Sequence, residues 1–366
     1  MDVAEFFFEV DDPRRDGSCF HVLSDIIMIV LCGYLADCEG FVEVHDYATD
    51  KEKFLRQFLQ LPSGIPSHDT LNRVFRRIDP TQLEAALGQW SQQIVQLIKG
   101  QHLVIDGKQL RGTTPSGKKQ APIQLVSVWA EAHRLCLAQE QVDEKANEIV
   151  AIPNLLKPLD IEGAVVSIDA IGCQKELVAL IVKKKADYII GLKTNQGTLY
   201  DQVSDHFDKH KQTMSQSVSR DLGHGRAEKR TVWLSHDLRW LDVIEDWTGL
   251  NSVVRVDSEC WRGGELHRAS RYYISSLLSS TPEQAGRYIR RHWSIENEQH
   301  WHLDITFDED SCQVRSDHAP RNLSTVRKLA LGLISQESSK MSLKRKRKKA
   351  ARDDEYLKTL LAQLHS

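Results

Sequence analysis

Two aspartates stand at the ends of predicted strands, where they could bind a metal ion. Residues 103–105 and 164–168 are short apolar runs rich in β-branched side chains, which is typical of buried strands. Asp106 follows the first run and Asp169 the second. Open α/β sheets bind ligands beyond the C-terminal ends of their strands. Bound divalent cations at such acids can activate a water or a hydroxyl for attack on a phosphate. Asp169 could instead start a turn or cap the helix that follows it.

A third acid is expected on a long helix over residues 283–303. Glu296 and His300 are spaced i, i+4 and share one helix face. Glu298 lies about 200° round the helix from Glu296, so only one of these glutamates can face the sheet, and we expect Glu296. Acids held close together repel one another unless a cation lies between them. Oxygen ligands without a cysteine pair favour Mg²⁺ or Mn²⁺ over Zn²⁺.

The elements that must position these acids follow a recognisable order. Residues 102–192 are predicted to form three strands with short connections, a helix, a strand, a helix and a strand. A β-rich stretch follows at about 220–278, with a turn around Gly263 and Gly264. The acid-bearing helix comes next. This is the layout of a ribonuclease-H-like core interrupted before its last helix. We therefore predict an α/β fold with a ribonuclease-H-like mixed sheet and a β-rich insertion.

The two ends of the chain are predicted to form separate parts. Residues 1–99 read as an all-helical domain, in which Ser67 caps a short helix with several arginines. That helix could enter a DNA groove. We favour the alternative, in which it packs within a helical bundle and its basic face is solvated. This face could still contact DNA phosphates. Residues 100–335 are the predicted catalytic domain. Residues 336–366 are a predicted basic tail with six consecutive basic residues at 344–349. These six side chains could simply be solvated, or they could bind DNA phosphates.

Composition narrows the classes of protein to consider. The 366 residues carry a net charge of −3, so any surface for nucleic acid must be locally basic. Seven widely spaced cysteines without a CxxC pair argue against a disulfide framework and a structural zinc site, and indicate a reducing compartment. The N-terminus lacks the order of a signal peptide. The apolar run at 22–36 is too short to cross a bilayer. We expect a cytoplasmic, nucleoid-associated protein without a membrane partner.

The sequence resembles the H-repeat-associated transposases, bacterial insertion-sequence enzymes of the Asp-Asp-Glu type. The matching blocks occur in the same order along nearly the whole chain. They are SDIIMIVLCGYLADCEGF (24–41), GIPSHDTLNRV (64–74), VIDGKQLRG (104–112), DEKANEI (143–149), IDAIGCQKE (168–176), ADYIIGLKTNQG (186–197), HGRAEKR (224–230), RYYISS (271–276), RRHWSIENEQHWHLDITFDEDSC (290–312) and KRKRKKAARDDEYL (344–357).

The resemblance implies a metal-dependent transposase that cuts DNA at element ends and joins the 3′-hydroxyl to target DNA. It implies Asp106, Asp169 and Glu296 as catalytic metal ligands. Tyr288, Arg291 and Glu296 are similar to the first three members of a Tyr-Arg-Glu-Lys signature, but the gap between the arginine and the glutamate is one residue longer here. Leu303 stands where the lysine would be.

The expected cofactor is Mg²⁺ or Mn²⁺, and the expected partner is double-stranded DNA, bound by a homodimer. Two competing functions keep the same fold: a DNA-binding relic or regulator of transposition without catalysis, and a host nuclease that hydrolyses DNA without strand transfer. Candidate DNA contacts are polar and basic residues near the strand ends, in the β-rich insertion and on the long helix: Lys108, Lys193, Asn195, Gln196, His224, Arg226, Arg230, Arg291 and His300. Ordinary turn chemistry or solvated surface could also account for them.

Overall fold

The computed structural model describes residues 6–15, 19–95, 100–114, 121–142, 147–223 and 226–365. The chain divides into two compact units. Unit 1 comprises Met1–Gln96, Gly107–Glu144 and Glu296–Ser366, and unit 2 comprises Leu97–Asp106 and Lys145–Ile295. The predicted domain boundaries near residues 99 and 335 do not coincide with this division, because unit 1 gathers three separate segments of the chain.

A nine-stranded mixed sheet has the strand order β3-β2-β1-β4-β5-β9-β8-β7-β6. Strand β1 (His102–Leu110) pairs in parallel with β4 (Val165–Ile168), and β4 pairs in parallel with β5 (Asp187–Leu192). Strands β2 (Ile123–Ala130) and β3 (Leu135–Val142) form an antiparallel pair. The predicted α/β fold with a ribonuclease-H-like mixed sheet is confirmed.

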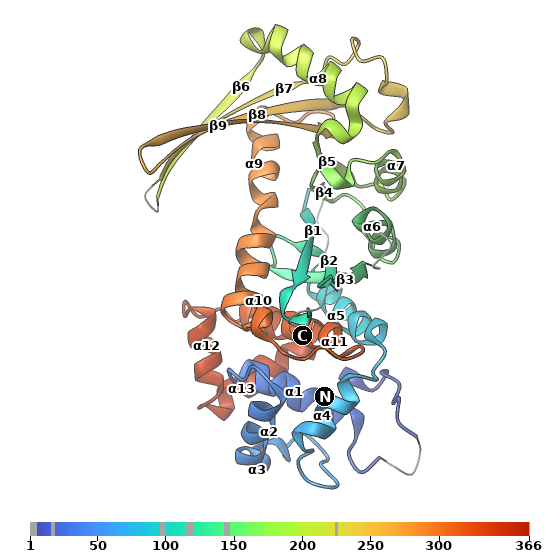
Figure 1. Cartoon of the computed structure of the whole chain (residues 1–366), viewed down its shortest axis with the longest axis vertical. Coiled ribbons are helices and arrows are strands. Elements are labelled where there is room, and N and C mark those ends of the chain that lie inside the picture. The colour runs from blue at the N-terminus through green and yellow to red at the C-terminus, as the bar shows by residue number, and fades with distance from the viewer. Residues whose placement is uncertain are drawn as a thin grey trace. The chain divides into compact units, whose positions relative to one another are not determined.

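Helices cover both faces of the parallel strands in unit 2. Figure 1 shows α6 (Glu148–Leu156) and α7 (Lys175–Lys183) on one side of β4 and β5, and α9 (Pro282–His292) on the other. Ala285 and Ile289 of α9 belong to a buried apolar cluster that includes Val165 of β4 and Ile189 of β5. This packing fixes α9 against β5 and against β4, the strand that Asp169 follows.

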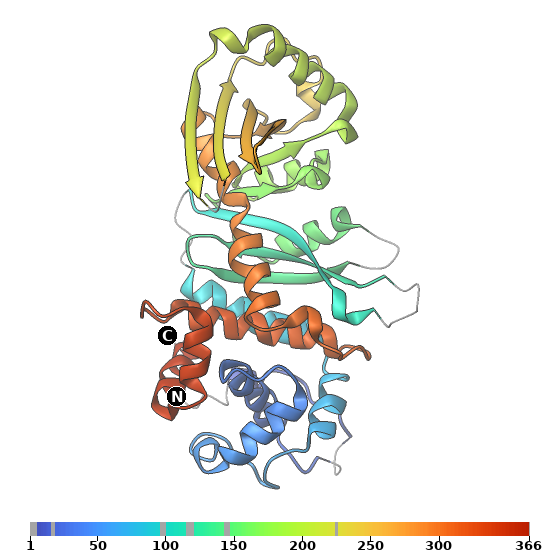
Figure 2. The same ribbon diagram turned by 60° about the vertical axis from the view of Figure 1, so that its left-hand side comes forward.

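The predicted β-rich insertion is also confirmed. Strands β6 (Gln216–Gly223), β7 (Arg226–Ser235), β8 (Ser252–Arg262) and β9 (Glu265–Ser275) run antiparallel to one another and lie side by side in Figure 2. Gly263 and Gly264 connect β8 to β9 with φ angles of 60° and 86°, which glycine adopts without steric cost. Helix α8 (Gly197–His210) precedes this sheet and was not predicted.

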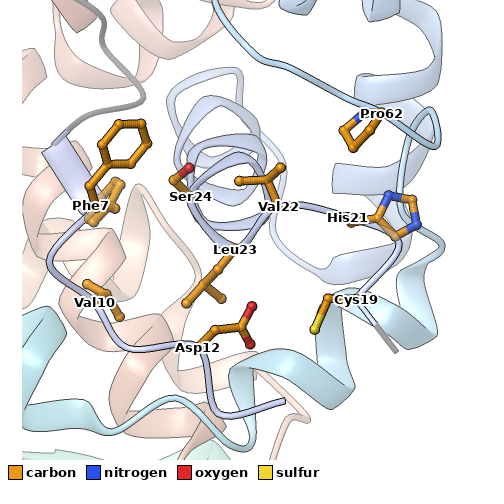
Figure 3. A pocket seen from close by; sticks show the side chains of 10 residues that line it. Phe7, Val10, Asp12, Cys19, His21, Val22, Leu23, Ser24 and Pro62 are labelled. Atoms are coloured by element: carbon orange, nitrogen blue, oxygen red, sulfur yellow. The ribbon is translucent and has the colours of Figure 1, made fainter. Parts of the chain in front are cut away.

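The N-terminal part of unit 1 is helical, as predicted. It contains α1 (Leu23–Leu35), α2 (Phe41–Asp50), α3 (Glu52–Leu55), α4 (His68–Phe75) and α5 (Pro80–Ile94). Every residue of α1 is buried. Ser67 caps α4, where its hydroxyl accepts from the Thr70 amide at 3.3 Å. A pocket of about 350 Å³ lies between the segment around Phe7 and Val10 and the start of α1 (Figure 3).

The helix predicted over residues 283–303 is interrupted. Helix α9 ends at His292, a π-helical segment spans Ile295–His300, and α10 runs from Trp301 to Ile305. A π turn closes i→i+5 hydrogen bonds and therefore takes up one residue more than an α-helical turn. Such turns are frequent at functional sites.

The C-terminal region folds into helices instead of forming a basic tail. Helices α11 (Ala319–Gln336), α12 (Leu343–Ala350) and α13 (Asp354–Leu361) all belong to unit 1. Within the run of six basic residues, Lys346 is 3% exposed and Arg347 is fully buried. The run is therefore divided between side chains that hold the fold and side chains that face solvent.

Candidate active site

The register of two parallel strands brings Asp106 and Asp169 to one edge of the sheet. Ile105 on β1 pairs with Ile168 on β4. Asp106 follows Ile105 within β1, which continues beyond its predicted end to Leu110, and Asp169 directly follows the last residue of β4. Neighbouring strands lie about 4.8 Å apart. The side chain of Asp106 is half-buried and that of Asp169 is exposed. Both acids thus stand beside each other at the edge where open α/β sheets bind ligands.

Asp169 also caps the short 3₁₀ turn Ala170–Gly172. Its Oδ1 accepts from the backbone amide of Ile171 at 3.0 Å. The predicted alternatives, a capping role and a metal-binding role, are compatible, because one carboxylate oxygen caps the turn and a second is present on the same group. The turn is packed closely from β5, where a Cβ on Gly191 would lie 3.0 Å from the Ala170 nitrogen.

A buried hydrogen-bonded chain lies below the acids in unit 2. The Ser167 hydroxyl on β4 is 2.7 Å from His102 Nε2 and 2.9 Å from His292 Nδ1. Since a hydroxyl donates one proton and accepts another, it can link two neutral imidazoles. Burial lowers the pKa of His102 to about 3 and that of His292 to about 4, although the charge of Asp169 opposes the second shift. Both rings are therefore neutral near pH 7.

Neither Ser167 nor His102 was predicted as part of the site. A serine and a histidine within otherwise apolar buried strands were the available signal, because buried polar side chains require hydrogen-bond partners. The chain joins β1, β4 and the last residue of α9. It thereby ties the strands that carry both aspartates to the helix that leads toward Glu296.

The two glutamates of the π-helical segment differ in their surroundings. Glu298 pairs with Arg134 at 2.8 Å, within unit 1. Glu296 is exposed, and partial burial of its carboxyl raises its pKa. This difference favours Glu296 as the acid that could bind a cation. The π turn can also absorb the additional residue between Arg291 and Glu296.

The aspartate pair fits a hard divalent cation. Mg²⁺ and Mn²⁺ prefer oxygen ligands, and adjacent carboxylates at an accessible sheet edge provide them. Across the described ranges, no three His, Cys, Asp or Glu side chains are gathered closely enough to hold a metal ion. Asp106 and Asp169 are thus two of the predicted ligands, and Glu296 remains a predicted third.

Lys108 is placed where it is unsuited to the predicted DNA contact. It is 8% exposed and its Nζ donates to Asp304 Oδ1 at 2.5 Å. Asp310 and Glu309 lie at 3.5 and 3.7 Å. Burial alone would lower the pKa of Lys108, but these acids raise it above its ordinary value. The lysine therefore neutralises a buried acidic cluster in unit 1.

The turn after β5 contains three of the predicted DNA contacts, and two of them bind the protein itself. Lys193 is exposed. Asn195 Nδ2 donates to the Ala170 carbonyl at 2.9 Å, and Gln196 Nε2 donates to the Cys173 carbonyl at 2.7 Å. Both amides thus hold the loop that follows Asp169.

The other predicted contacts are dispersed. His224 lies outside the described residues, and of Arg226 only the backbone, in β7, is described. Arg230 pairs with Glu228 and, at 3.3 Å, with Asp221. Arg291 is exposed on α9. His300 is largely buried in unit 1, which lowers its pKa to about 3. Arg230 and His300 are therefore less accessible than predicted.

Comparisons with known proteins identify the family. The domain described as "Transposase DDE domain" matches residues 98–333, and the one described as "DDE_Tnp_1-associated" matches residues 4–91. The "H repeat-associated putative transposase YhhI" of Escherichia coli K12 is 33% identical, over 96% of this chain and 96% of that protein. The "Uncharacterized protein in dhlA 3'region" of Xanthobacter autotrophicus is 39% identical, over 74% of this chain and 93% of that protein.

Among solved structures, the cryo-EM structure of a piggyBac transposase synaptic complex with hairpin DNA is similar, with a TM-score of 0.49 and 12% identity. That similarity covers 100% of this chain and 81% of the other. None of the described helices has the length and apolarity needed to cross a membrane. The domain matches and the nearly full-length identity carry the assignment: this chain belongs to the H-repeat-associated transposases, which contain a transposase DDE domain.

Proposed function

We propose that this protein cuts DNA at the ends of a mobile element and joins the freed 3′-hydroxyl to target DNA, using Mg²⁺ or Mn²⁺ held by Asp106, Asp169 and Glu296. The observation that supports the proposal is the in-register pairing of β1 and β4, in which Ile105 and Ile168, the residues before Asp106 and Asp169, are partners in a chain of this family. Apolar packing does not require acids at that edge.

The roles of the protein groups follow from their positions. Asp106 and Asp169 supply negative charge to hold the cations, and Glu296 supplies more from the π-helical segment. The bound cations would activate the attacking water or 3′-hydroxyl and stabilise the leaving oxygen. Neutral His292 and Ser167 fix the end of α9 against β4 without adding positive charge that would compete with a cation.

The proposed DNA surface in unit 2 includes the arginines of α9. The side chains of Arg287 and Arg290 are 58% and 46% exposed, and Arg291 is exposed next to them. Lys193 is exposed at the end of β5, the strand next to β4. Such cations bind phosphates without reading sequence, which lets a nearly neutral protein bind DNA at a local basic surface.

The experiment is a cleavage assay on DNA carrying the terminal inverted repeats that flank the gene. Purified protein should cut at the repeat boundary only when Mg²⁺ or Mn²⁺ is present, and a labelled 3′ end should become joined to a second duplex. Cleavage without joining would indicate a nuclease. Specific binding of the repeats without metal-dependent cleavage would indicate a regulator.

A further inference from the structure

We propose that Asn195 and Gln196 are positioning residues for Asp169, which act through the loop behind it and not through DNA. The inference rests on the proposed function, because it concerns the geometry of a metal-binding carboxylate. It replaces the DNA contacts that the sequence suggested for these two amides.

The two side chains hold opposite ends of one short turn. The carbonyl of Ala170, next to Asp169, accepts from Asn195 Nδ2 at 2.9 Å. The carbonyl of Cys173 accepts from Gln196 Nε2 at 2.7 Å. These carbonyls belong to the first residue of the 3₁₀ turn Ala170–Gly172 and to the residue after it, and within the turn the Ile171 amide donates to the Asp169 carboxylate. The amides therefore fix the backbone on which the Asp169 carboxylate depends.

The turn gains from such external support because it is short and few backbone hydrogen bonds hold it. Its backbone bonds are Gly172 to Asp169 at 3.1 Å and Cys173 to Ala170 at 3.3 Å. Short 3₁₀ turns have poor hydrogen-bond geometry. Backbone carbonyls here also require partners, since Ala170 and Cys173 are 5% and 0% exposed. The side-chain amides of Asn195 and Gln196, the amide clamp, give the Cys173 carbonyl a donor and the Ala170 carbonyl a second and shorter hydrogen bond than the one from the Cys173 amide.

Close packing completes the arrangement. Gly191 precedes the clamp on β5, and a Cβ there would lie 3.3 Å from the Asp169 carbonyl carbon and 3.0 Å from the Ala170 nitrogen. The loop after Asp169 is thus held by backbone contact from β5 and by two side-chain amides from the turn that follows β5. All of these groups belong to unit 2.

The test uses Asn195→Ala and Gln196→Ala in the full-length protein, since each removes the donating amide without adding a charge near the metal ligands or the DNA. Thr194→Ala is the matched control. Thr194 is exposed in the same turn, and its side chain takes no part in the hydrogen bonds given above for this turn. Lys193→Ala serves as the control for a DNA contact. Variants are compared only after thermal melts show a folded protein, and Asn195→Ser and Gln196→Ser replace any variant that fails.

Hydrogen–deuterium exchange measures the loop directly. Peptides that cover residues 168–175 should exchange faster in the Asn195 and Gln196 variants and at the wild-type rate in Thr194→Ala. Mn²⁺ affinity, measured by calorimetry, and the cleavage rate at saturating DNA should each fall about 10–100-fold, as for other residues that orient metal ligands. DNA affinity should stay at the wild-type value and fall only in Lys193→Ala.

Two results would overturn the inference. One is unchanged exchange over 168–175 in both amide variants. The other is a lower DNA affinity in the Asn195 and Gln196 variants with an unchanged cleavage rate at saturating DNA. That result would indicate that both residues contact DNA. Because exchange requires neither metal nor DNA, the clamp can be tested even if wild-type protein fails to cleave DNA, a result that would reject the proposed function alone.

Discussion

Replacing Arg347 by alanine should destabilise unit 1 strongly, although the residue lies in a run of six basic side chains. Its guanidinium is fully buried and donates to the carbonyls of Tyr34 at 2.8 Å, Cys38 at 3.0 Å and Thr306. It also pairs with Asp37 at 3.1 Å. One side chain thus joins α12 to the end of α1 and to the segment after α10.

The magnitude follows from the groups left without partners. Each buried carbonyl that loses its donor costs about 1–3 kcal/mol. The costs of three such carbonyls and of the cavity would add up to more, but entry of water and relaxation of the structure reduce the total. We therefore expect the free energy of unfolding to fall by about 3–5 kcal/mol, the range for breaking a buried charged pair. Lys348→Ala removes one charge from the exposed side of the same helix and should change stability by about 0.5 kcal/mol or less.

Urea unfolding of wild type, Arg347→Ala and Lys348→Ala measures the difference. A gel-shift series across salt concentrations, with the same proteins, reports DNA binding. The Lys348 variant should reduce the salt dependence if its side chain contacts phosphate, by a slope of about 0.9 for one lost contact. A decrease in the free energy of unfolding below about 1 kcal/mol in Arg347→Ala would refute the structural role given to Arg347, one of the two buried residues of this run.

Three further predictions follow. Glu296→Gln should abolish metal-dependent cleavage with the fold retained in thermal melts, whereas Glu298→Gln should retain cleavage, because its ion pair with Arg134 lies at the surface and is worth at most about 1 kcal/mol. Below its ordinary pKa of about 6.5, His292 takes up a proton in the unfolded state but stays neutral in the folded state down to about pH 4. Stability should therefore fall as pH falls from 7 to 5, by about 2 kcal/mol from this group, and His292→Gln should show a smaller fall in urea titrations. Gly191→Ala should lower the melting temperature and weaken Mn²⁺ binding, since its methyl group would displace the Asp169–Ala170 peptide; a wild-type melting curve and affinity would contradict the close packing.

Local patterns were sufficient to predict the sheet and the aspartate pair. Strand β3, the acid within β1 and the acid directly after β4 could be predicted because an apolar run followed by a polar residue is a local signal. The parallel pairing followed from the order of elements, since a strand, a crossover helix and a second strand restrict the topology. The turn at Gly263 and Gly264 could also be predicted from local sequence, because positive φ angles favour glycine.

Features that depend on distant contacts could not be predicted. The carbonyl that Arg347 binds at Tyr34 lies 313 positions away, and an arginine in a basic run is usually solvated. From sequence, Asn195 could be a turn residue or a DNA contact. Its hydrogen-bond partner could not be predicted, because a backbone carbonyl such as that of Ala170 has no sequence signature. The π turn at Ile295–His300 has no local composition signal of its own, and the longer gap between Arg291 and Glu296 is the one sequence feature that agrees with it.

The central claim is that Asp106 and Asp169 hold the divalent cations that drive DNA cleavage. The most direct measurement is calorimetric titration of Mn²⁺ into wild type, Asp106→Asn and Asp169→Asn, with the cleavage rate of each protein recorded at saturating metal. Asparagine caps the turn after β4 about as well as aspartate, so the fold should survive at that position. We predict that both variants lose Mn²⁺ binding and cleavage while their affinity for element-end DNA is kept or increased. Wild-type Mn²⁺ affinity and full cleavage by Asp169→Asn would contradict the account and leave Asp169 as a helix cap alone.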